Sequence, residues 1–155
     1  AWQSAGRTDI GGGLSLLSMA DADYVYLCIP LPPESFGSID LYIAEPDGAL
    51  TDLHVSAQTG ERSRGPQGWP EWRAFNNYRG WFGPPVAFNG FAANGDVDFT
   101  FSPARELQLS RARFGAGPWR IMVEVDAIAP NNRKVTFPAD ANADNATTWA
   151  EFSVP

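Results

Sequence analysis

Residues 23–48 read DYVYLCIPLPPESFGSIDLYIAEPDG, and this stretch decides which class of fold the chain adopts. Its first part, residues 24–31, is almost wholly apolar or aromatic and is ended by a cluster of prolines. In residues 39–44 apolar and polar side chains alternate, and Glu-Pro-Asp-Gly at 45–48 predicts a turn. A segment that is apolar on both faces is typical of a central strand in a two-layer protein, whereas an alternating segment is typical of its half-buried neighbour.

The rest of the chain contains further short segments with strand patterns. These segments are residues 14–19, 50–58, 86–91, 97–102, 106–109, 119–126, 135–137 and 148–154. The 15 Gly and 13 Pro are spread along the chain, which favours many short elements joined by turns. We find no helical period longer than about two turns. The pattern predicts an all-β fold, a two-layer antiparallel β-sandwich of the jelly-roll or immunoglobulin-like type, with roughly nine to eleven strands.

The length of 155 residues suits a single domain that spans residues 1–155. Residues 1–13 are polar and end in three glycines, so we expect a flexible start in which Trp2 belongs to a first short strand. Residues 111–117 are expected to form a loop.

Residues 60–85 mix Arg, Gly and Pro with aromatic side chains, and they predict one long aromatic loop with at most a short strand near residues 72–78. Long loops inside compact domains are often functional. Sugar-binding modules stack pyranose rings on Trp or Tyr, while polar side chains bind the hydroxyl groups. The candidate ligand-binding residues are Trp69, Trp72, Arg73, Asn76, Tyr78, Arg79 and Trp81. Trp69 and Trp81 are the first candidates for stacking on a sugar, because flanking Gly or Pro residues tend to hold a ring out from the surface. The alternative is that these aromatic side chains anchor the loop to the sandwich.

The charge and cysteine content disfavour several classes of protein. The net charge of −7 argues against nucleic acid as a partner, because a phosphate backbone requires a basic surface. No apolar run is long enough to span a bilayer. The single cysteine, Cys28, cannot form an internal disulfide and is expected to be a small buried hydrophobe. The chain opens at Ala1 without a visible signal peptide, as a processed chain would, and we expect an extracytoplasmic protein, whether secreted, periplasmic or at the cell surface.

The order of several segments along the chain carries a resemblance to a known family. The segments are an opening part with Trp2, the D-Y-x-Y-L-x-I pattern of Asp23, Tyr24, Tyr26, Leu27 and Ile29, the I-D-L-Y-I of 39–43, the E-L-Q-L-S of 106–110, the strand-like 119–126, and a final W-x-x-F with Trp149 and Phe152. This order resembles carbohydrate-binding module family 9 and the DOMON-like β-sandwich superfamily over most of the chain, but not over residues 60–85. The resemblance implies a β-sandwich whose relatives include sugar binders, haem-b electron carriers and accessory domains.

A calcium loop is a second candidate site. Asp140, Asn142, Asp144 and Glu151 have the spacing of positions one, three, five and twelve of an EF-hand loop, with an Asn where Gly is usual. Pro138 lies where an entering helix would be, so the pattern favours calcium on a β-scaffold over a true EF-hand. The alternative interpretation is an Asx-rich surface turn.

Haem and catalysis have weaker support in the sequence. Haem-binding relatives in the resembled family use Met with His or Lys as axial ligands, and this chain offers Met19, Met122, His54 and Lys134. Core packing explains the two methionines, and a surface position explains His54, so we do not expect haem. No motif of a catalytic nucleophile, a zinc protease or a carboxylate pair is present, and no catalytic residue is predicted.

These observations predict a non-catalytic, extracytoplasmic carbohydrate-binding module that uses the aromatic loop and is stabilised by calcium. The alternative is a structural or interaction domain of a surface or extracellular assembly, in which the same aromatic side chains contact protein. A haem-b electron-transfer domain is the third hypothesis.

Overall fold

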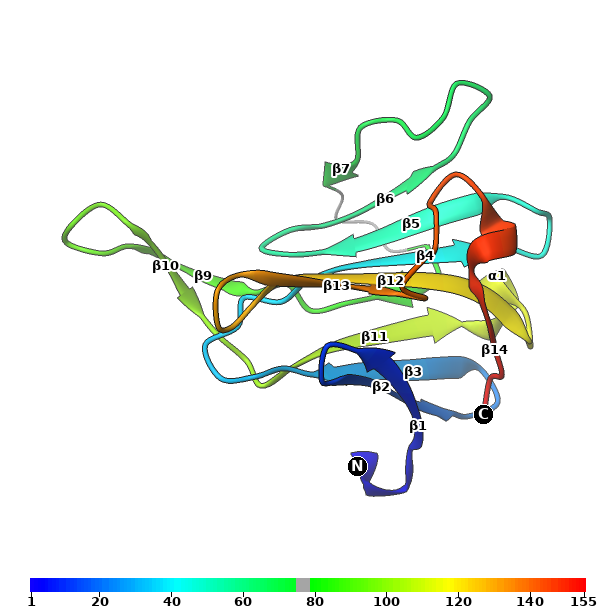
Figure 1. Cartoon of the computed structure of the whole chain (residues 1–155), viewed down its shortest axis with the longest axis horizontal. Helices are drawn as coiled ribbons and strands as arrows, with labels where there is room; N and C mark the ends of the chain where they lie inside the picture. The colour runs from blue at the N-terminus through cyan, green and yellow to red at the C-terminus, as the bar shows by residue number, and fades with distance from the viewer. Residues whose placement is uncertain (75–78) are drawn as a thin grey trace.

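The computed structural model describes residues 1–74 and 79–155, and two antiparallel sheets face each other across a common core (Figure 1). The predicted all-β, two-layer antiparallel sandwich is therefore confirmed. The core is built from alternate positions of strands in both sheets; Leu27 and Ile29 from one sheet meet Ile39 and Leu41 from the other. The segment quoted first above supplies strands to both layers.

The first sheet, sheet A, has the strand order β1-β2-β3-β11-β8. Its strands are β1 (Gly6–Gly11), β2 (Leu14–Ala20), β3 (Tyr24–Pro30), β11 (Ala104–Ser110) and β8 (Trp81–Phe82). The apolar segment at 24–30 is a central strand, as predicted, because β2 and β11 flank it. Cys28 is buried, and burial raises the pKa of its thiol to about 11, so the thiol stays protonated at neutral pH.

The second sheet, sheet B, has the order β13-β12-β4-β5-β6-β7, and β14 also pairs with β12. Its strands are β13 (Arg133–Phe137), β12 (Trp119–Ile128), β4 (Ser38–Ala44), β5 (Leu50–Val55), β6 (Thr59–Ser63), β7 (Arg73–Ala74) and β14 (Ala150–Phe152). Along β4, Ile39 and Leu41 face the core, whereas Asp40 is only half-buried and lies on the outer face. This is the alternation that the sequence predicts.

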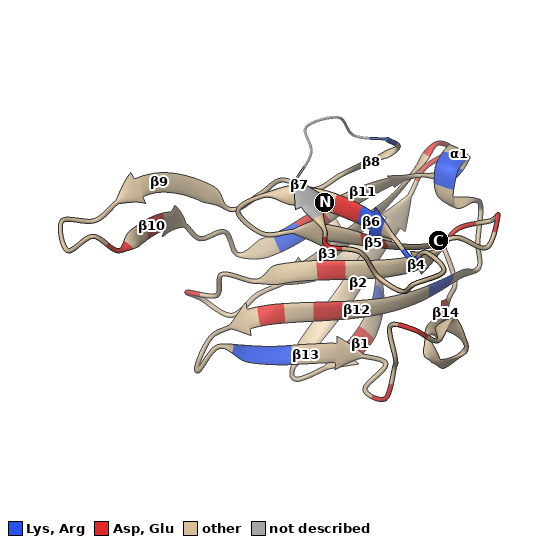
Figure 2. Ribbon diagram, turned by 90° about the horizontal axis from the view of Figure 1, so that it is seen from above, with Lys and Arg blue, Asp and Glu red and all other residues tan. Residues whose placement is uncertain are grey.

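A two-stranded arm projects from the sandwich, and it is seen in both ribbon views (Figures 1 and 2). It consists of β9 (Ala87–Phe91) and β10 (Val97–Thr100), joined by a turn in which Asn94 accepts a hydrogen bond from the amide of Asp96. Because β8 and β11 pair at its base, the arm continues a long hairpin. Prolines at 84, 85 and 103 lack amide donors and interrupt that hairpin between its inner and outer halves.

Three local predictions are wrong. Trp2 lies in the 3-10 helix η1 (Trp2–Ser4), and residues 6–11 form β1, which pairs with β2 instead of being a flexible start. Residues 111–114 form the short helix α1 (Arg111–Phe114), because the hydroxyl of Ser110 caps its first turn. Residues 60–85 are not one loop, since strand pairing places β6 and β8 at its two ends, whereas the short strand expected near residues 72–78 is present as β7.

Candidate functional site

The outer face of sheet A presents aromatic and polar side chains in one row across the strands. Gln108 of β11 lies opposite Tyr26 of β3 on one side and opposite Phe82 of β8 on the other. Strand alternation explains this row, because Leu107 and Leu109 point into the core and leave Gln108 on the outer face. An amide is thus bordered by two aromatic residues on an exposed sheet.

We call this surface the aromatic groove. It comprises two adjoining hollows of about 260 and 210 Å³ that share Phe82 and Gln108, and its main lining residues are Trp2, Tyr24, Tyr26, Phe82, Glu106 and Gln108. Tyr24 is 37% exposed and Phe82 is 41% exposed, so both side chains form part of the molecular surface. The ring centroids of Tyr24 and Tyr26 are 6.3 Å apart.

Polar contacts hold the walls of the aromatic groove. The indole nitrogen of Trp2 donates to Oε1 of Glu106 at 2.9 Å, and the hydroxyl of Tyr26 donates to Oδ2 of Asp21 at 2.8 Å. The backbone amides of Tyr24 and Asp23 also donate to Asp21 and lower the pKa of its carboxyl below the ordinary value. Among the described residues, the side-chain amide of Gln108 has no hydrogen-bond partner, so it is free for a ligand.

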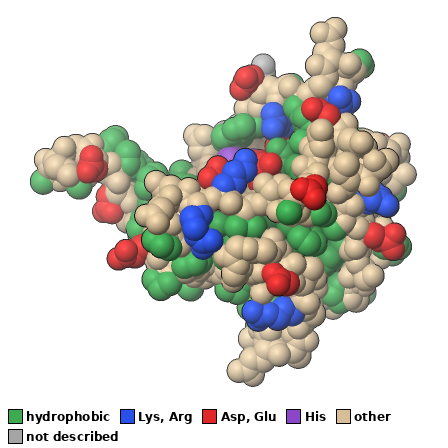
Figure 3. Space-filling view, in the orientation of Figure 1, with side chains coloured by type: hydrophobic (Ala, Val, Ile, Leu, Met, Phe, Trp, Pro, Cys, Tyr) green, Lys and Arg blue, Asp and Glu red, His purple; other side chains and the backbone are tan. Residues whose placement is uncertain are grey.

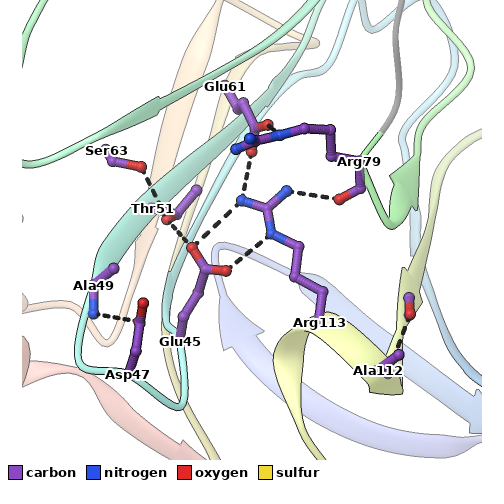
Figure 4. Close-up of polar contacts among 10 residues, drawn as sticks. Glu45, Asp47, Ala49, Thr51, Glu61, Ser63, Arg79, Ala112 and Arg113 are labelled. Atoms are coloured by element: carbon purple, nitrogen blue, oxygen red, sulfur yellow. Dashed lines mark hydrogen bonds and ion pairs between the residues drawn. The ribbon is translucent and has the colours of Figure 1, made fainter.

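An arginine at the end of the sandwich positions the strand that carries Phe82 (Figure 4). Arg113 of α1 places Nε 2.9 Å from Oε1 of Glu45 and Nη2 2.7 Å from Oε2 of Glu61, so it joins sheet A to sheet B. Its Nη1 donates to the carbonyl of Arg79 at 2.8 Å. Burial would raise the pKa of Glu45, but hydrogen bonds from Arg113 and Thr51 hold it below its ordinary value.

The turn before β8 then sets which way Phe82 points. The amide of Ser110 donates to the carbonyl of Gly80 at 2.7 Å, which draws this turn against the end of β11. Gly80 has a φ of +79°, and a Cβ there would lie 3.2 Å from Cβ of Arg113. Glycine tolerates both the positive φ and the close approach of Arg113, because it has no Cβ. The following residues enter β8 with the Trp81 side chain inward and the Phe82 side chain outward.

The ring of Trp81 does not project from the surface in the way that its flanking glycine predicted. It is 3% exposed and belongs to the hydrophobic core, although Trp81 borders the second hollow of the aromatic groove, and its role in ligand binding stays a prediction. Its neighbour Phe82 has the exposed ring instead. Two-residue strands leave no pattern from which the inward side can be read, since alternation needs a longer run.

Trp69 and Trp72 pack on the outer face of sheet B, away from the aromatic groove. The ring of Trp69 makes an edge contact with Tyr42 at a centroid distance of 5.3 Å, and its indole nitrogen donates to the carbonyl of Ala143 at 3.1 Å. Trp72 stacks on His54 at 4.3 Å. These are contacts of the kind expected if the aromatic side chains anchor residues 64–72 to the sandwich.

The other predicted residues of this segment are only partly described. Arg79 has an exposed side chain whose Nε lies 3.4 Å from Oε1 of Glu61. The side chain of Arg73 and the whole of Asn76 and Tyr78 lie outside the described residues, so their proposed role in ligand binding stays a prediction.

A polar network lies beneath Trp72 on sheet B. Asp52 is 1% exposed and places Oδ2 2.8 Å from Nε of Arg62, and the carboxylate of Asp40 on the neighbouring strand is close enough to affect its pKa. Asp40 in turn contacts Nδ1 of His54 at 3.0 Å. Burial together with the neighbouring carboxylate raises the pKa of Asp52 to about 8. Asp52 is enclosed, so its carboxyl group does not face solvent, whereas Asp40 is half-buried.

The predicted calcium-binding residues lie on an exposed loop that is ordered by its own hydrogen bonds. The side chain of Asn142 accepts from the amide of Asp144, and Oδ1 of Asp144 lies 3.1 Å from Nε of Arg64. Asp140 is exposed before the turn, and Glu151 is exposed on β14. Within residues 1–74 and 79–155, no three His, Cys, Asp or Glu side chains are grouped so that they could hold a metal ion. Calcium binding by a mixed set that includes amide and carbonyl oxygens stays a prediction.

The four residues considered for haem do not all lie on one sheet. Met19 lies on β2 of sheet A, whereas Met122 and His54 lie on sheet B. Met122 is fully buried beneath Tyr42 and Trp149, and the amino group of Lys134 lies 3.5 Å from Oε2 of Glu124. Met122, Lys134 and His54 thus each have a packing or polar partner.

Most residues of the aromatic groove were missed as site residues. Trp2, Tyr24 and Tyr26 entered the sequence analysis only as parts of strands or of a family pattern, and Glu106 and Gln108 only as parts of a segment. The available signal is the alternation of Tyr24 and Tyr26 with Val25 and Leu27, which assigns the tyrosines to one face. Phe82 on β8 and Trp2 on η1 lie in elements too short to show an alternating pattern.

Comparison of the chain with family models, curated proteins and solved structures found no match. The resemblance to carbohydrate-binding module family 9 and the DOMON-like superfamily therefore rests on the sequence patterns alone. In the part of the chain that the structure describes, no helix has the length and apolar character that crossing a bilayer requires.

Proposed function

We propose that this protein is a non-catalytic, extracytoplasmic carbohydrate-binding module whose ligand lies in the aromatic groove. The observation that carries the proposal is the row of Tyr26, Gln108 and Phe82 across three strands of sheet A. It pairs ring faces with a free amide on a surface that is shaped by rigid strands. This site replaces the predicted loop as the place of binding and retains Trp81 and Phe82 from that loop.

The chemistry of a sugar matches this surface. The C–H face of a pyranose ring is apolar and packs on an aromatic ring, whereas the hydroxyl groups at the rim need hydrogen-bond partners. In the aromatic groove, Tyr24 and Phe82 supply exposed rings, and Gln108 and Glu106 supply polar atoms between them. Apolar walls with a few fixed polar groups are typical of small-molecule sites.

Binding without catalysis is the simplest activity of such a surface. Hydrolysis of a glycosidic bond requires two carboxyl groups on either side of the bond. Glu106 is the one carboxylate among the described residues that line the two hollows. A groove with several rings and one carboxylate is therefore suited to holding a saccharide chain.

A glycan-array screen of the purified protein in calcium-containing buffer tests the proposal. We expect a defined set of bound sugars and loss of that binding in Phe82→Ala and Tyr24→Ala. Phe101→Ala is a matched control, because Phe101 is 48% exposed but lies on the strand-free segment beside the arm. A blank array from protein with an intact melting transition would overturn the proposal.

An interaction domain is the second candidate, and the arm favours it. Phe88, Phe91, Val97 and Phe101 are exposed on or beside β9 and β10, and hydrophobic side chains gather along this projection (Figure 3). Phe91 is 71% exposed, and exposed apolar surfaces of this kind often contact protein. If the arm mediates assembly, Phe91→Ser should reduce the oligomer size in light scattering and leave glycan binding unchanged. A monomeric wild-type protein at high concentration would argue against self-assembly.

A further inference from the structure

We infer that the aromatic groove selects saccharides that carry protonated amino groups, such as oligomers of a deacetylated amino sugar. This inference rests on the proposed carbohydrate-binding function and adds the charge class of the ligand. It follows from the side chains that line the groove and from the charges beside it.

The lining of the aromatic groove combines ring faces with a single negative charge. Glu106 is exposed and lies on β11 next to Gln108, with Tyr26 and Phe82 in the adjacent row. No Lys or Arg is among the described residues that line its two hollows. A cation in this groove would therefore be attracted by the carboxylate of Glu106, and no Lys or Arg among the described lining residues would repel it.

Glu106 is held in place but still has an oxygen to offer. The indole nitrogen of Trp2 binds Oε1, and among the described residues Oε2 has no hydrogen-bond partner. An ammonium group that donates to this oxygen would form a charge-assisted hydrogen bond, which is about twice as strong as one between neutral groups. The contact with Trp2 keeps the carboxylate in position, so little side-chain entropy is lost when the ligand binds.

The rings add a second attraction for the same group. The faces of Trp, Tyr and Phe attract cations within about 6 Å of the ring centroid, and aromatic surfaces of this kind recognise alkylammonium groups. Trp2, Tyr26 and Phe82 line the same hollow as Glu106. An amino sugar would use both attractions, whereas a neutral sugar would use only the apolar contact and ordinary hydrogen bonds.

Two carboxylates beside the groove act in the same direction. Asp21 and Asp23 flank the start of β3, close to Tyr24. The nearby Arg111 directs its guanidinium to the backbone carbonyls of Asp21 and Pro155. The chain also has a net charge of −7, so an anionic saccharide would meet repulsion both locally and at long range.

Isothermal titration with matched tetrasaccharides at about pH 6, where aliphatic amines are protonated, tests this inference. The ligands are a β-1,4-glucosamine tetramer, its N-acetylated counterpart, cellotetraose and a galacturonic acid tetramer. We expect the glucosamine tetramer to bind about tenfold more tightly than the acetylated one, as one hydrogen bond to a charged group implies, and the galacturonate not to bind. Added salt should weaken the binding of the glucosamine tetramer and leave that of cellotetraose unchanged.

Glu106→Gln is the decisive variant, because it removes the charge and retains an oxygen that accepts from Trp2. It should bring the affinity for the glucosamine tetramer down to that of the acetylated tetramer, while Asp98→Asn, on the arm, serves as the control. Equal binding of amino and acetylated forms to the wild type would overturn the charge selection and leave the proposed function intact. Preference for galacturonate would also overturn it, and no binding of any saccharide would overturn both.

Discussion

The indole nitrogen of Trp2 lies 2.9 Å from Oε1 of Glu106, a residue 104 positions later in the chain. This contact brings the 3-10 helix at the start of the chain onto the outer face of sheet A. It both closes one side of the aromatic groove and orients its carboxylate.

Trp2→Phe should therefore weaken saccharide binding without unfolding the protein. Phenylalanine keeps an aromatic ring but loses the donor, and one lost hydrogen bond of about 1 kcal/mol corresponds to about a fivefold weaker Kd. Titration of the saccharide found in the array screen measures this effect. Trp69→Phe is the control, because its indole donates to Ala143 on sheet B. Equal losses in both variants would mean that the effect does not arise in the groove.

Trp81 and Phe82 should have opposite roles in stability and binding although they are adjacent. Trp81→Ala removes a ring from the core and should lower the free energy of unfolding by about 3–5 kcal/mol. Phe82→Ala removes an exposed ring and should change that free energy by no more than about 0.5 kcal/mol, while it weakens saccharide binding. Urea denaturation and saccharide titration separate the two effects. A large loss of stability in Phe82→Ala would contradict the assignment of its ring to the surface.

Arg113→Ala should loosen the turn that precedes β8. The substitution leaves Glu45 and Glu61 without their shared cation and the carbonyl of Arg79 without its donor. Breaking a largely buried ion pair costs about 3 kcal/mol, so we expect a clear drop in the melting temperature. Saccharide binding should fall as well, because Phe82 follows this turn. Arg7→Ala, an exposed arginine on β1, should change neither quantity.

The free energy of unfolding should fall as the pH rises, because Asp52 ionises at a higher pH in the folded protein than in the unfolded chain. The pKa of Asp52 is raised from 3.8 to about 8 in the folded protein, so between these values the folded state holds a proton that the unfolded state releases. Its contribution to stability is full below about pH 4, declines up to about pH 8, and is constant above that value. The facing groups are Asp40 and Tyr42 on β4, His54 on β5 and Arg62 on β6.

Urea denaturation at several values between about pH 5 and pH 9 measures this decline. Asp52→Asn should flatten it, because the amide cannot ionise. The comparison is repeated in a His54→Gln background, since His54 contacts Asp40. An unchanged slope in both Asn variants would show that Asp52 is ionised in the folded protein throughout.

Calcium should raise the melting temperature if the loop at 140–151 binds it. At a calcium concentration 100-fold above Kd, the gain in the free energy of unfolding is about 2.7 kcal/mol. Asp144→Asn should abolish the gain, and Arg64→Ala should increase it, because Arg64 competes for the same carboxylate. Asp96→Asn on the arm is the control. Identical melting curves with calcium and with a chelator would remove this proposal.

The family resemblance predicted a sandwich that binds sugar, and the sandwich is confirmed while the ligand stays a prediction. Ligand binding by the predicted residues of 60–85 stays a prediction, and the site proposed instead is the aromatic groove. Tryptophans are the strongest sugar-binding signal in a sequence, but Trp69 makes contacts with Tyr42 and Ala143, and Trp81 fills the core. Phe82, a residue type with a weaker sugar-binding signal, is the more exposed of the adjacent pair Trp81 and Phe82.

The sequence by itself determined the longer strands of 24–30 and 38–44 and their faces, because these depend on neighbours two residues apart. The alternation in 39–44, the prolines after 24–29 and the Pro-Asp-Gly turn after β4 are all local, and each predicted element is present. Only the tertiary structure decided which faces meet. The aromatic groove joins residues 2, 24–26, 82 and 106–108, and the carboxyl pair joins Asp40 to Asp52. Both depend on the register between strands, which arises from packing of the whole sandwich and leaves no trace in any single segment.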